Sequence, residues 1–262
     1  MNLDLTGKTA LVCGSTQGIG KETAIELALL GANVTLIARN EDTLKEVLTD
    51  LPRKKNQKHR YLVIDFSKTT HIKPKIDKYL AKYPDAHILI NNTGGPAGGA
   101  IIEASTDQLS QAFNEHIIPA QILTQAVVGS MKAAAFGRII CITSVGMKEP
   151  IVGLGVSNTI RAAMGNWAKS MANELGQFGI TTNLVLPGYT KTGRLEKVNQ
   201  MRAKSTNKTT EEVENDLLKS IPIGRFTEPE ETAAVIAFLC SPAAASVNGV
   251  SIPVDGGKSS SF

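Results

Sequence analysis

Short apolar runs recur along this chain, and polar or amphipathic stretches separate them. Runs rich in Val, Ile and Leu are typical of strands buried on both faces of a parallel sheet. We expect such strands at residues 8–13, 33–38, 61–64, 87–90, 138–143, 181–186 and 250–254. Helical periodicity predicts helices at about 21–30, 69–83, 106–135, 155–178 and 228–240, and Pro119 should kink the longest of them.

This alternation of strand and helix predicts βαβ units with right-handed crossovers, and therefore an α/β protein. The expected architecture is a Rossmann-like, doubly wound parallel sheet of about seven strands within three α/β/α layers. No repeat or linker divides the 262 residues, so we predict a single domain over 1–262. The polar segment at about 190–220 is interpreted as a lid, in which Thr209 and Glu212 predict a helical capping box.

Composition narrows the function classes. Apolar residues make up 42% of the chain and charged residues 20%, which is ordinary for a soluble protein. The three cysteines are scattered and the four histidines show no ligand spacing, so we expect a cytoplasmic protein without a metal. No apolar segment reaches the length of a membrane span. The basic run 53–60 is expected to be a solvated loop; a phosphate patch or nucleic-acid surface is the weaker alternative.

A glycine turn directly follows the first predicted strand and opens the first predicted helix. Glycines let the backbone approach a pyrophosphate, and the free N–H groups of a helix N-terminus attract its charge. A strand, a glycine turn and a helix in this order predict a dinucleotide cradle. Its expected residues are Gly14, Ser15, Thr16, Gln17, Gly18, Ile19 and Gly20.

The end of the second predicted strand indicates which dinucleotide is bound. Dinucleotide folds often carry an acidic residue there, which binds the ribose 2′-hydroxyl. This chain has Ala38 at that point, followed by Arg39 and Asn40. An uncharged position beside a guanidinium suits a 2′-phosphate, so we predict that NADP(H) is favoured over NAD(H). The alternative is that Arg39 is only a surface loop residue.

The stretch 137–161 carries the expected chemistry. A hydroxyl at Ser144 follows a buried apolar run, and a helix begins near Gly155. Ser157 and Arg161 lie four residues apart on that helix and therefore share a face. We expect Ser144, Ser157 and Arg161 to face one point.

Together these motifs resemble those of the short-chain dehydrogenase/reductase family, in particular the β-ketoacyl carrier-protein reductases, over nearly the whole length. The resemblance implies NADP(H) bound over the carboxyl ends of the strands. It places Asp65, Phe66, Asn91, Thr93 and Gly94 beside the cofactor, and Pro187, Gly188 and Thr192 at its nicotinamide end. The motifs that carry it are the glycine turn, Asp65, Asn91-Asn92-x-Gly94, Ser144, Pro187-Gly188, Thr192 and Asp255-Gly256-Gly257.

The family's reaction moves a hydride between nicotinamide and a carbonyl or alcohol carbon. In the family, a Ser orients the substrate oxygen, a Tyr donates the proton, a Lys lowers the pKa of that Tyr, and an Asn completes the relay. Ser144 keeps the first of these residues. Counting along the chain places Ser157 at the Tyr position, Arg161 at the Lys position and His116 at the Asn position.

Each replacement has chemical consequences. Ser157 is a poor proton donor near neutral pH. Arg161 keeps a positive charge and can hold the ribose hydroxyls of the cofactor, but it cannot release a proton. The ordinary pKa of a histidine, about 6.5, suits acid–base work near neutrality. We therefore predict a relay in which Ser144 and Ser157 orient the oxygen, Arg161 stabilises negative charge and His116 passes a proton through water. Tyr189 is a second candidate donor, and His116 is alternatively a helix histidine bonded to a carbonyl.

The predicted function is NADP(H)-dependent oxidation or reduction of a small carbonyl or alcohol substrate, or of an acyl thioester. The alternative is a catalytically silent nucleotide-binding protein of the same fold, acting as a sensor or a structural subunit. The basic lid would either receive an anionic substrate or form a solvated surface. The resemblance also implies a homodimer or homotetramer. The basic lid residues are Arg194, Lys197, Arg202, Lys204 and Lys208.

Overall fold

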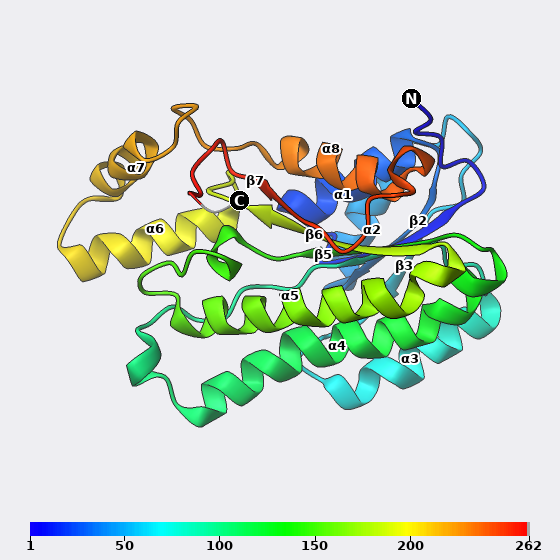
Figure 1. Cartoon of the computed structure of the whole chain (residues 1–262), viewed down its shortest axis with the longest axis horizontal. Helices are drawn as coiled ribbons and strands as arrows, with labels where there is room; N and C mark the ends of the chain where they lie inside the picture. The colour runs from blue at the N-terminus through cyan, green and yellow to red at the C-terminus, as the bar shows by residue number, and fades with distance from the viewer. Residues whose placement is uncertain (261–262) are drawn as a thin grey trace.

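The computed structural model describes residues 1–260 and contains a seven-stranded sheet in which every strand pairs in parallel. The strand order is β3-β2-β1-β4-β5-β6-β7, so the chain runs outward in both directions from β1 and β4 (Figure 1). The strands are β1 (Thr9–Cys13), β2 (Asn33–Ala38), β3 (Arg60–Val63), β4 (Ile88–Asn91), β5 (Gly137–Ile142), β6 (Ile180–Pro187) and β7 (Ser251–Val254). The predicted doubly wound sheet is confirmed.

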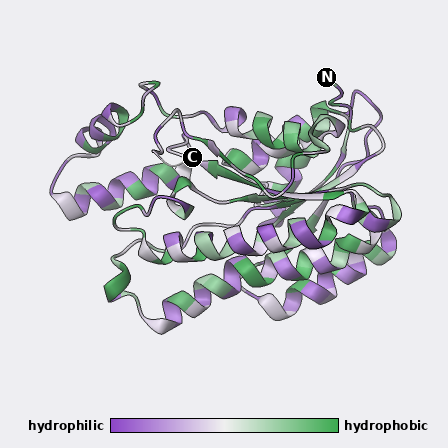
Figure 2. Ribbon diagram, viewed as in Figure 1, coloured by the Kyte–Doolittle hydropathy of each residue, from purple (hydrophilic) through white to green (hydrophobic). Residues whose placement is uncertain are grey.

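Helices cover both faces of the sheet (Figure 1). One face packs against α1 (Gly18–Leu29), α2 (Glu41–Asp50) and α8 (Pro229–Cys240), and the other packs against α3 (Thr69–Lys82), α4 (Thr106–Ala133) and α5 (Gly155–Leu175). The apolar side chains of the strands divide between these two layers, because successive side chains point to opposite faces. Figure 2 shows hydrophobic strands between helices that are hydrophilic on their outer sides. The predicted three-layer arrangement is confirmed.

Two segments differ from the sequence-based prediction. Helix α2 was not predicted; Asn40 begins it by accepting a hydrogen bond from the Thr43 backbone N–H at 3.1 Å. The predicted lid contains the expected short helix, α7 (Thr210–Lys219), and before it a longer helix that was not predicted, α6 (Gly193–Thr206); both extend beyond the sheet at the left of Figure 1. The capping box between Thr209 and Glu212 is confirmed at the start of α7. Helix α4 continues through Pro119.

The carboxyl edge of the sheet positions the candidate site. Strand β1 pairs with β2 on one side and β4 on the other, and the loops after β1 and β4 leave this edge in opposite senses. Such a reversal of strand order leaves a crevice at the carboxyl ends, where ligands bind in open α/β sheets. No helix among residues 1–260 is both long and apolar enough to cross a membrane.

Candidate active site

The glycine turn after β1 leaves room for a phosphate. Gly14 and Gly18 have φ angles of +59° and +52°, which L side chains rarely adopt. A Cβ at Gly20 would lie 2.2 Å from the Gly14 carbonyl oxygen, so only glycine fits there. No side chain caps the N-terminus of α1 and no acidic residue lies in its first turn, so an anion would meet no competing carboxylate. This geometry fits a pyrophosphate.

Loops from two other strands meet the glycine turn. The Asn92 side-chain amide donates to the Gly14 carbonyl oxygen at 3.3 Å, and the methyl group of Thr192 lies 3.0 Å from where a Cβ of Gly18 would stand. The amide of Asn91 instead turns into the sheet and donates to Cys141 Sγ at 3.8 Å. Asn92 was absent from the predicted cofactor residues, although its place in the Asn-Asn motif was a signal for it.

The adenosine end of the expected cofactor site lies at the ends of β2 and β3. Arg39 is exposed there and is in no ion pair among residues 1–260. A hydrogen bond from Ser67 lowers the pKa of Asp65, and Lys68 and Arg39 make smaller contributions in the same direction. The Ser15 hydroxyl is buried 3.5 Å from the Ile37 carbonyl. Arg39 is therefore available to an anionic ligand.

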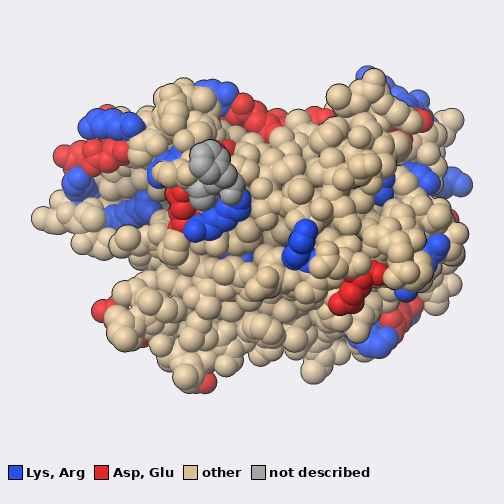
Figure 3. Space-filling view, in the orientation of Figure 1, with Lys and Arg blue, Asp and Glu red and all other residues tan. Residues whose placement is uncertain are grey.

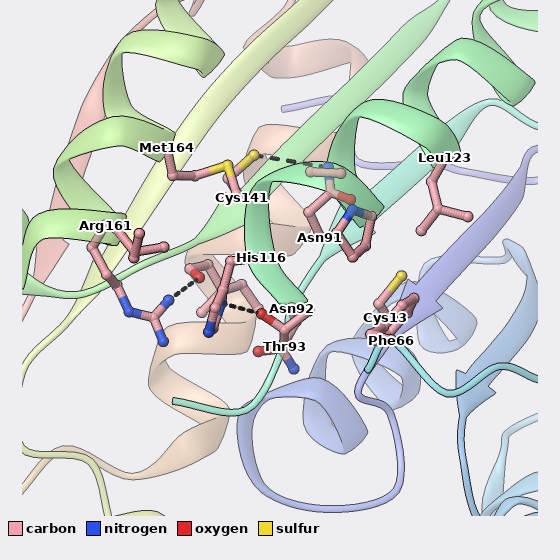
Figure 4. A pocket seen from close by; sticks show the side chains of 14 residues that line it. Cys13, Phe66, Asn91, Asn92, Thr93, His116, Leu123, Cys141, Arg161 and Met164 are labelled. Atoms are coloured by element: carbon pink, nitrogen blue, oxygen red, sulfur yellow. Dashed lines mark hydrogen bonds between the residues drawn. The ribbon is translucent and has the colours of Figure 1, made fainter. Parts of the chain in front are cut away.

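His116 and Arg161 lie together beside the carboxyl ends of β4 and β5 (Figure 4). They line a small cavity of about 20 Å³, together with Asn92 and Thr93. His116 is 4% exposed; its Nδ1 is hydrogen-bonded to the Thr93 hydroxyl, and its Nε2 has no partner among residues 1–260. An orphaned buried nitrogen of this kind indicates that a ligand or a water completes the site.

The protonation state of His116 corrects the sequence-based expectation. Burial, and then the charges of Arg161 and Arg194, lower the pKa of His116 to about 3. The imidazole is therefore neutral at pH 7 rather than partly protonated. If the Thr93 hydroxyl donates to Nδ1, the Nε2–H of the neutral ring points to the cavity as a hydrogen-bond donor.

Arg161 carries a positive charge that no carboxylate balances. Its Nη1 donates to the Ile142 carbonyl oxygen at 2.9 Å, and it is in no ion pair among residues 1–260. Burial of the guanidinium, and then the charge of Arg194, lower the pKa of Arg161 to about 10, so it remains charged at pH 7. A partly buried cation without an anion is costly unless a ligand supplies acceptors.

Arg194 closes over the same region from helix α6. Its Nη2 donates to the Pro96 carbonyl oxygen at 2.7 Å, and its guanidinium lies 2.9 Å from where a Cβ of Gly95 would stand. Much of the residue is exposed, but partial burial of the guanidinium lowers its pKa. Arg194, one of the basic lid residues named from the sequence, therefore connects the lid to the loop after β4 and adds a second positive charge near Arg161.

A second, larger cavity of about 250 Å³ lies next to the first along the end of β5. Ile142 lines the first cavity, whereas Ser144 lines the second, with Gly188 and Tyr189 from the loop after β6 and Arg202 from α6. The Ser144 hydroxyl accepts the Gly146 backbone N–H at 3.1 Å, which leaves its own proton free to donate. Arg202 donates to the Tyr189 phenol at 3.4 Å.

The predicted catalytic residues do not all line one cavity. Ser144 lines the larger cavity, whereas His116 and Arg161 line the smaller one, because the Arg161 side chain turns toward the Ile142 carbonyl. Ser157 lies on the buried side of α5 at 8% exposure and lines neither cavity. The predicted convergence of all three side chains on one point is therefore not found in this arrangement.

The low pKa of His116 predicts a specific acid sensitivity. Unfolding frees the imidazole to bind a proton at about pH 6.5, whereas the folded protein resists protonation down to about pH 3. This contribution to stability is fully present above pH 6.5 and is lost as the pH falls toward 3, by up to about 1.4 kcal/mol per pH unit. Between pH 7.5 and 4.5, the free energy of unfolding measured with denaturant should fall more steeply for the native protein than for His116→Gln. An equal fall in the two proteins would contradict the low pKa of His116.

The fold and this edge define a class: a doubly wound α/β protein whose glycine turn and strand ends fit a dinucleotide beside a polar cavity. A family model described as enoyl-(acyl carrier protein) reductase matches residues 14–259. The chain belongs to the short-chain dehydrogenase/reductase family.

Several similar proteins have a named activity or a solved structure. The chain is 30% identical over 263 residues to a 3-oxoacyl-[acyl-carrier-protein] reductase of Chlamydia muridarum, covering 98% of this chain and 99% of the relative. It superposes on L-sorbose reductase from Gluconobacter frateurii, solved with NADPH and L-sorbose, with a TM-score of 0.91, 27% identity and 100% of both chains covered. An actinorhodin polyketide ketoreductase solved with NADPH gives a TM-score of 0.87 at 29% identity, covering 97% of this chain and 98% of the other.

Proposed function

We propose that this protein is an NADP(H)-dependent oxidoreductase that interconverts a small carbonyl compound and its alcohol by a non-standard proton relay. The observation that carries the proposal is the pair of His116 and Arg161 in one small cavity, where, among residues 1–260, the buried His116 Nε2 has no partner and the Arg161 charge has no carboxylate. A site with these unmet groups fits a ligand whose oxygen gains negative charge. Solved relatives with NADPH support the choice of cofactor.

The geometry of the glycine turn and of the carboxyl ends of the strands indicates which residues would hold the cofactor. The turn Gly14–Gly20 and the N-terminus of α1 would hold the pyrophosphate, and Arg39 would meet the 2′-phosphate. Asp65 and Phe66 would lie beside the adenine end. The loops carrying Thr93 and Gly94, and Pro187, Gly188 and Thr192, would bound the nicotinamide end. When bound, NADPH supplies the hydride for the carbonyl carbon.

In the proposed relay this chain's residues handle the oxygen. Arg161 supplies the positive charge that stabilises negative charge as it develops, and its charge persists at any physiological pH. His116 acts as a neutral hydrogen-bond donor through Nε2, not as an imidazolium, because its pKa lies near 3. The Ser144 hydroxyl would orient the substrate oxygen by donating a hydrogen bond from the neighbouring cavity, and it keeps its proton. Ser157, which lines neither cavity, would make no direct contact with that oxygen. The proton itself comes from water or from Tyr189.

A catalytically silent nucleotide-binding protein is the second candidate. The observation that favours it is the hydrogen bond of Arg161 to the Ile142 carbonyl, which turns the guanidinium away from the Ser144 cavity. Turnover by the native protein, lost in His116→Ala while NADPH still binds, separates the two candidates. Tight NADPH binding with no turnover across ketones, 3-oxoacyl thioesters, sugars and alcohols would favour the silent protein. A homodimer or homotetramer in a cytoplasmic setting is proposed with the enzyme.

The cofactor preference gives a sharper test. Arg39→Ala should raise the Kd for NADPH by roughly tenfold or more, because a charge-assisted contact to the 2′-phosphate is lost, and should leave NADH nearly unchanged. Quenching of protein fluorescence or a shift of the cofactor's fluorescence measures the Kd for each cofactor. Lys54→Ala is the matched control, since Lys54 is an exposed cation of the 53–60 loop. Equal weakening of both cofactors by Arg39→Ala, or a loss caused by Lys54→Ala, would contradict the assignment.

A further inference from the structure

Several elements contribute chemically different residues to the lining of the larger cavity. The loop after β5 contributes an apolar side with Val145, Pro150, Ile151 and Val152, and it also carries Ser144. The loop after β6, helix α6 and the turn after β7 contribute Tyr189, Arg202, Lys258 and Ser259. Two cations face one carboxylate, Glu149, so the lining is net positive. At about 250 Å³ the cavity lies just below the roughly 300–1,000 Å³ of typical ligand pockets, which indicates a small molecule.

Arg202 differs from the other basic residues of the lid. Lys208 is paired with Asp216, and Arg194 donates to the Pro96 carbonyl oxygen. The outer face of α6 and α7 mixes both signs of charge, as the left of Figure 3 shows, and is typical of a solvated surface. Arg202 is half-buried, lines the cavity and is in no ion pair among residues 1–260.

Tyr189 holds the Arg202 guanidinium in place. The guanidinium carbon lies 5.7 Å from the centre of the Tyr189 ring, and Nη1 donates to the phenol oxygen. The ring is supported in turn by an edge-on contact with Phe226, with 6.5 Å between the ring centres. A guanidinium fixed by one N–H keeps its remaining donors for a ligand, and its planar fork matches a carboxylate.

The Asp255-Gly256-Gly257 motif positions the second cation. Asp255 is 7% exposed and accepts backbone N–H groups from Gly257 at 3.0 Å and Ser259 at 2.8 Å. These bonds close a tight turn after β7, and Lys258 lies within that turn at the wall of the cavity. Lys258 is also in no ion pair among residues 1–260.

We propose that Arg202 and Lys258 bind the carboxylate of a small oxo acid or hydroxy acid, and that Tyr189 is the positioning residue for Arg202. The carbon skeleton then lies along the apolar side, and the reacting oxygen points to Ser144. This inference rests on the proposed function, because it assigns the substrate class of the same site.

Matched pairs of ligands test the carboxylate directly. L-Sorbose and 5-keto-D-gluconate differ by a CH₂OH group in place of a carboxylate, as do 5-hydroxy-2-pentanone and 4-oxopentanoate. Calorimetric titration of the NADP⁺-saturated protein should show that the acid of at least one pair binds about tenfold or more tightly than its neutral partner. Arg202→Gln should remove this preference, and Arg202→Lys should keep part of it. Lys197→Gln, on an exposed position of the same helix, should preserve it.

The outcomes separate this inference from the proposed function. NADP⁺ titration of each variant comes first; failure of the native protein to bind NADP⁺ counts against the proposed function. Intact NADP⁺ binding with no preference for either acid, or a preference that Arg202→Gln retains, overturns the carboxylate site alone. Acetoacetyl-coenzyme A is titrated as well. If it binds more tightly than both acids, and Arg202→Gln leaves its affinity unchanged, the carboxylate site is overturned in favour of an acyl thioester substrate.

Discussion

Replacing Arg161 by methionine should lower kcat/KM by about a hundredfold or more while leaving the fold intact. Removing one group that stabilises a developing oxyanion typically has an effect of this size. Methionine keeps much of the side-chain volume, and no carboxylate among residues 1–260 pairs with Arg161, so the change leaves no buried charge without its partner. Steady-state kinetics and thermal unfolding measure the two effects separately.

Arg161→Lys is the informative control for that loss. A lysine keeps the positive charge at this position, so it should retain much more activity than methionine. Its ammonium lacks the fork that reaches the Ile142 carbonyl, so some loss is expected. Activity in Arg161→Met equal to that of the native protein would remove this residue from the relay.

Replacing Gly20 by alanine should reduce NADP(H) binding by about two orders of magnitude and destabilise the protein by about 1–3 kcal/mol. The added methyl group would stand 2.2 Å from the Gly14 carbonyl oxygen, a backbone atom that moves only if the whole turn moves. The turn and the first N–H groups of α1 would then lose the geometry that suits a pyrophosphate. Fluorescence titration with NADPH and denaturant unfolding measure the two effects.

Gly129→Ala provides the comparison. Gly129 lies within α4, and a Cβ there meets nothing within 4 Å. Alanine should therefore stabilise the protein by about 0.5–1 kcal/mol and leave NADPH binding unchanged. Native-like NADPH affinity in Gly20→Ala would show that the turn is not the pyrophosphate site.

The sequence predicted most of the scaffold because the buried strands are continuous apolar runs. The runs around Val12, Leu36 and Ile140 are fully buried, as their composition indicated, and the boundaries shift by only a residue or so. Helix α2 was missed because its ten residues carry few apolar side chains and the basic run follows closely. Helix α6 was missed for the same reason, because it packs only a few side chains, such as Val198 and Ala203. The helix after it, α7, was predicted from its capping box.

The site was less predictable because its chemistry depends on tertiary surroundings. Periodicity placed Ser157 and Arg161 on one face of α5, but the direction of the Arg161 side chain follows from the Ile142 carbonyl, which no spacing reveals. The pKa of His116 depends on burial and on two guanidinium groups from other elements. The role of Arg202 required the position of Tyr189, thirteen residues earlier in the chain, and of the lid.

Transfer of deuterium from (4,4-²H₂)-labelled NADPH, which carries deuterium on both faces of the ring, to a carbonyl compound decides whether this protein transfers hydride. A single turnover of the native protein with each compound of the panel, oxo acids included, is followed by mass spectrometry of the product. We expect deuterium on the new carbinol carbon of at least one product alcohol, and almost none in the product formed by Arg161→Met. Saturating NADPH binding without label in any product would contradict it, and would leave a nucleotide-binding protein that performs no hydride transfer.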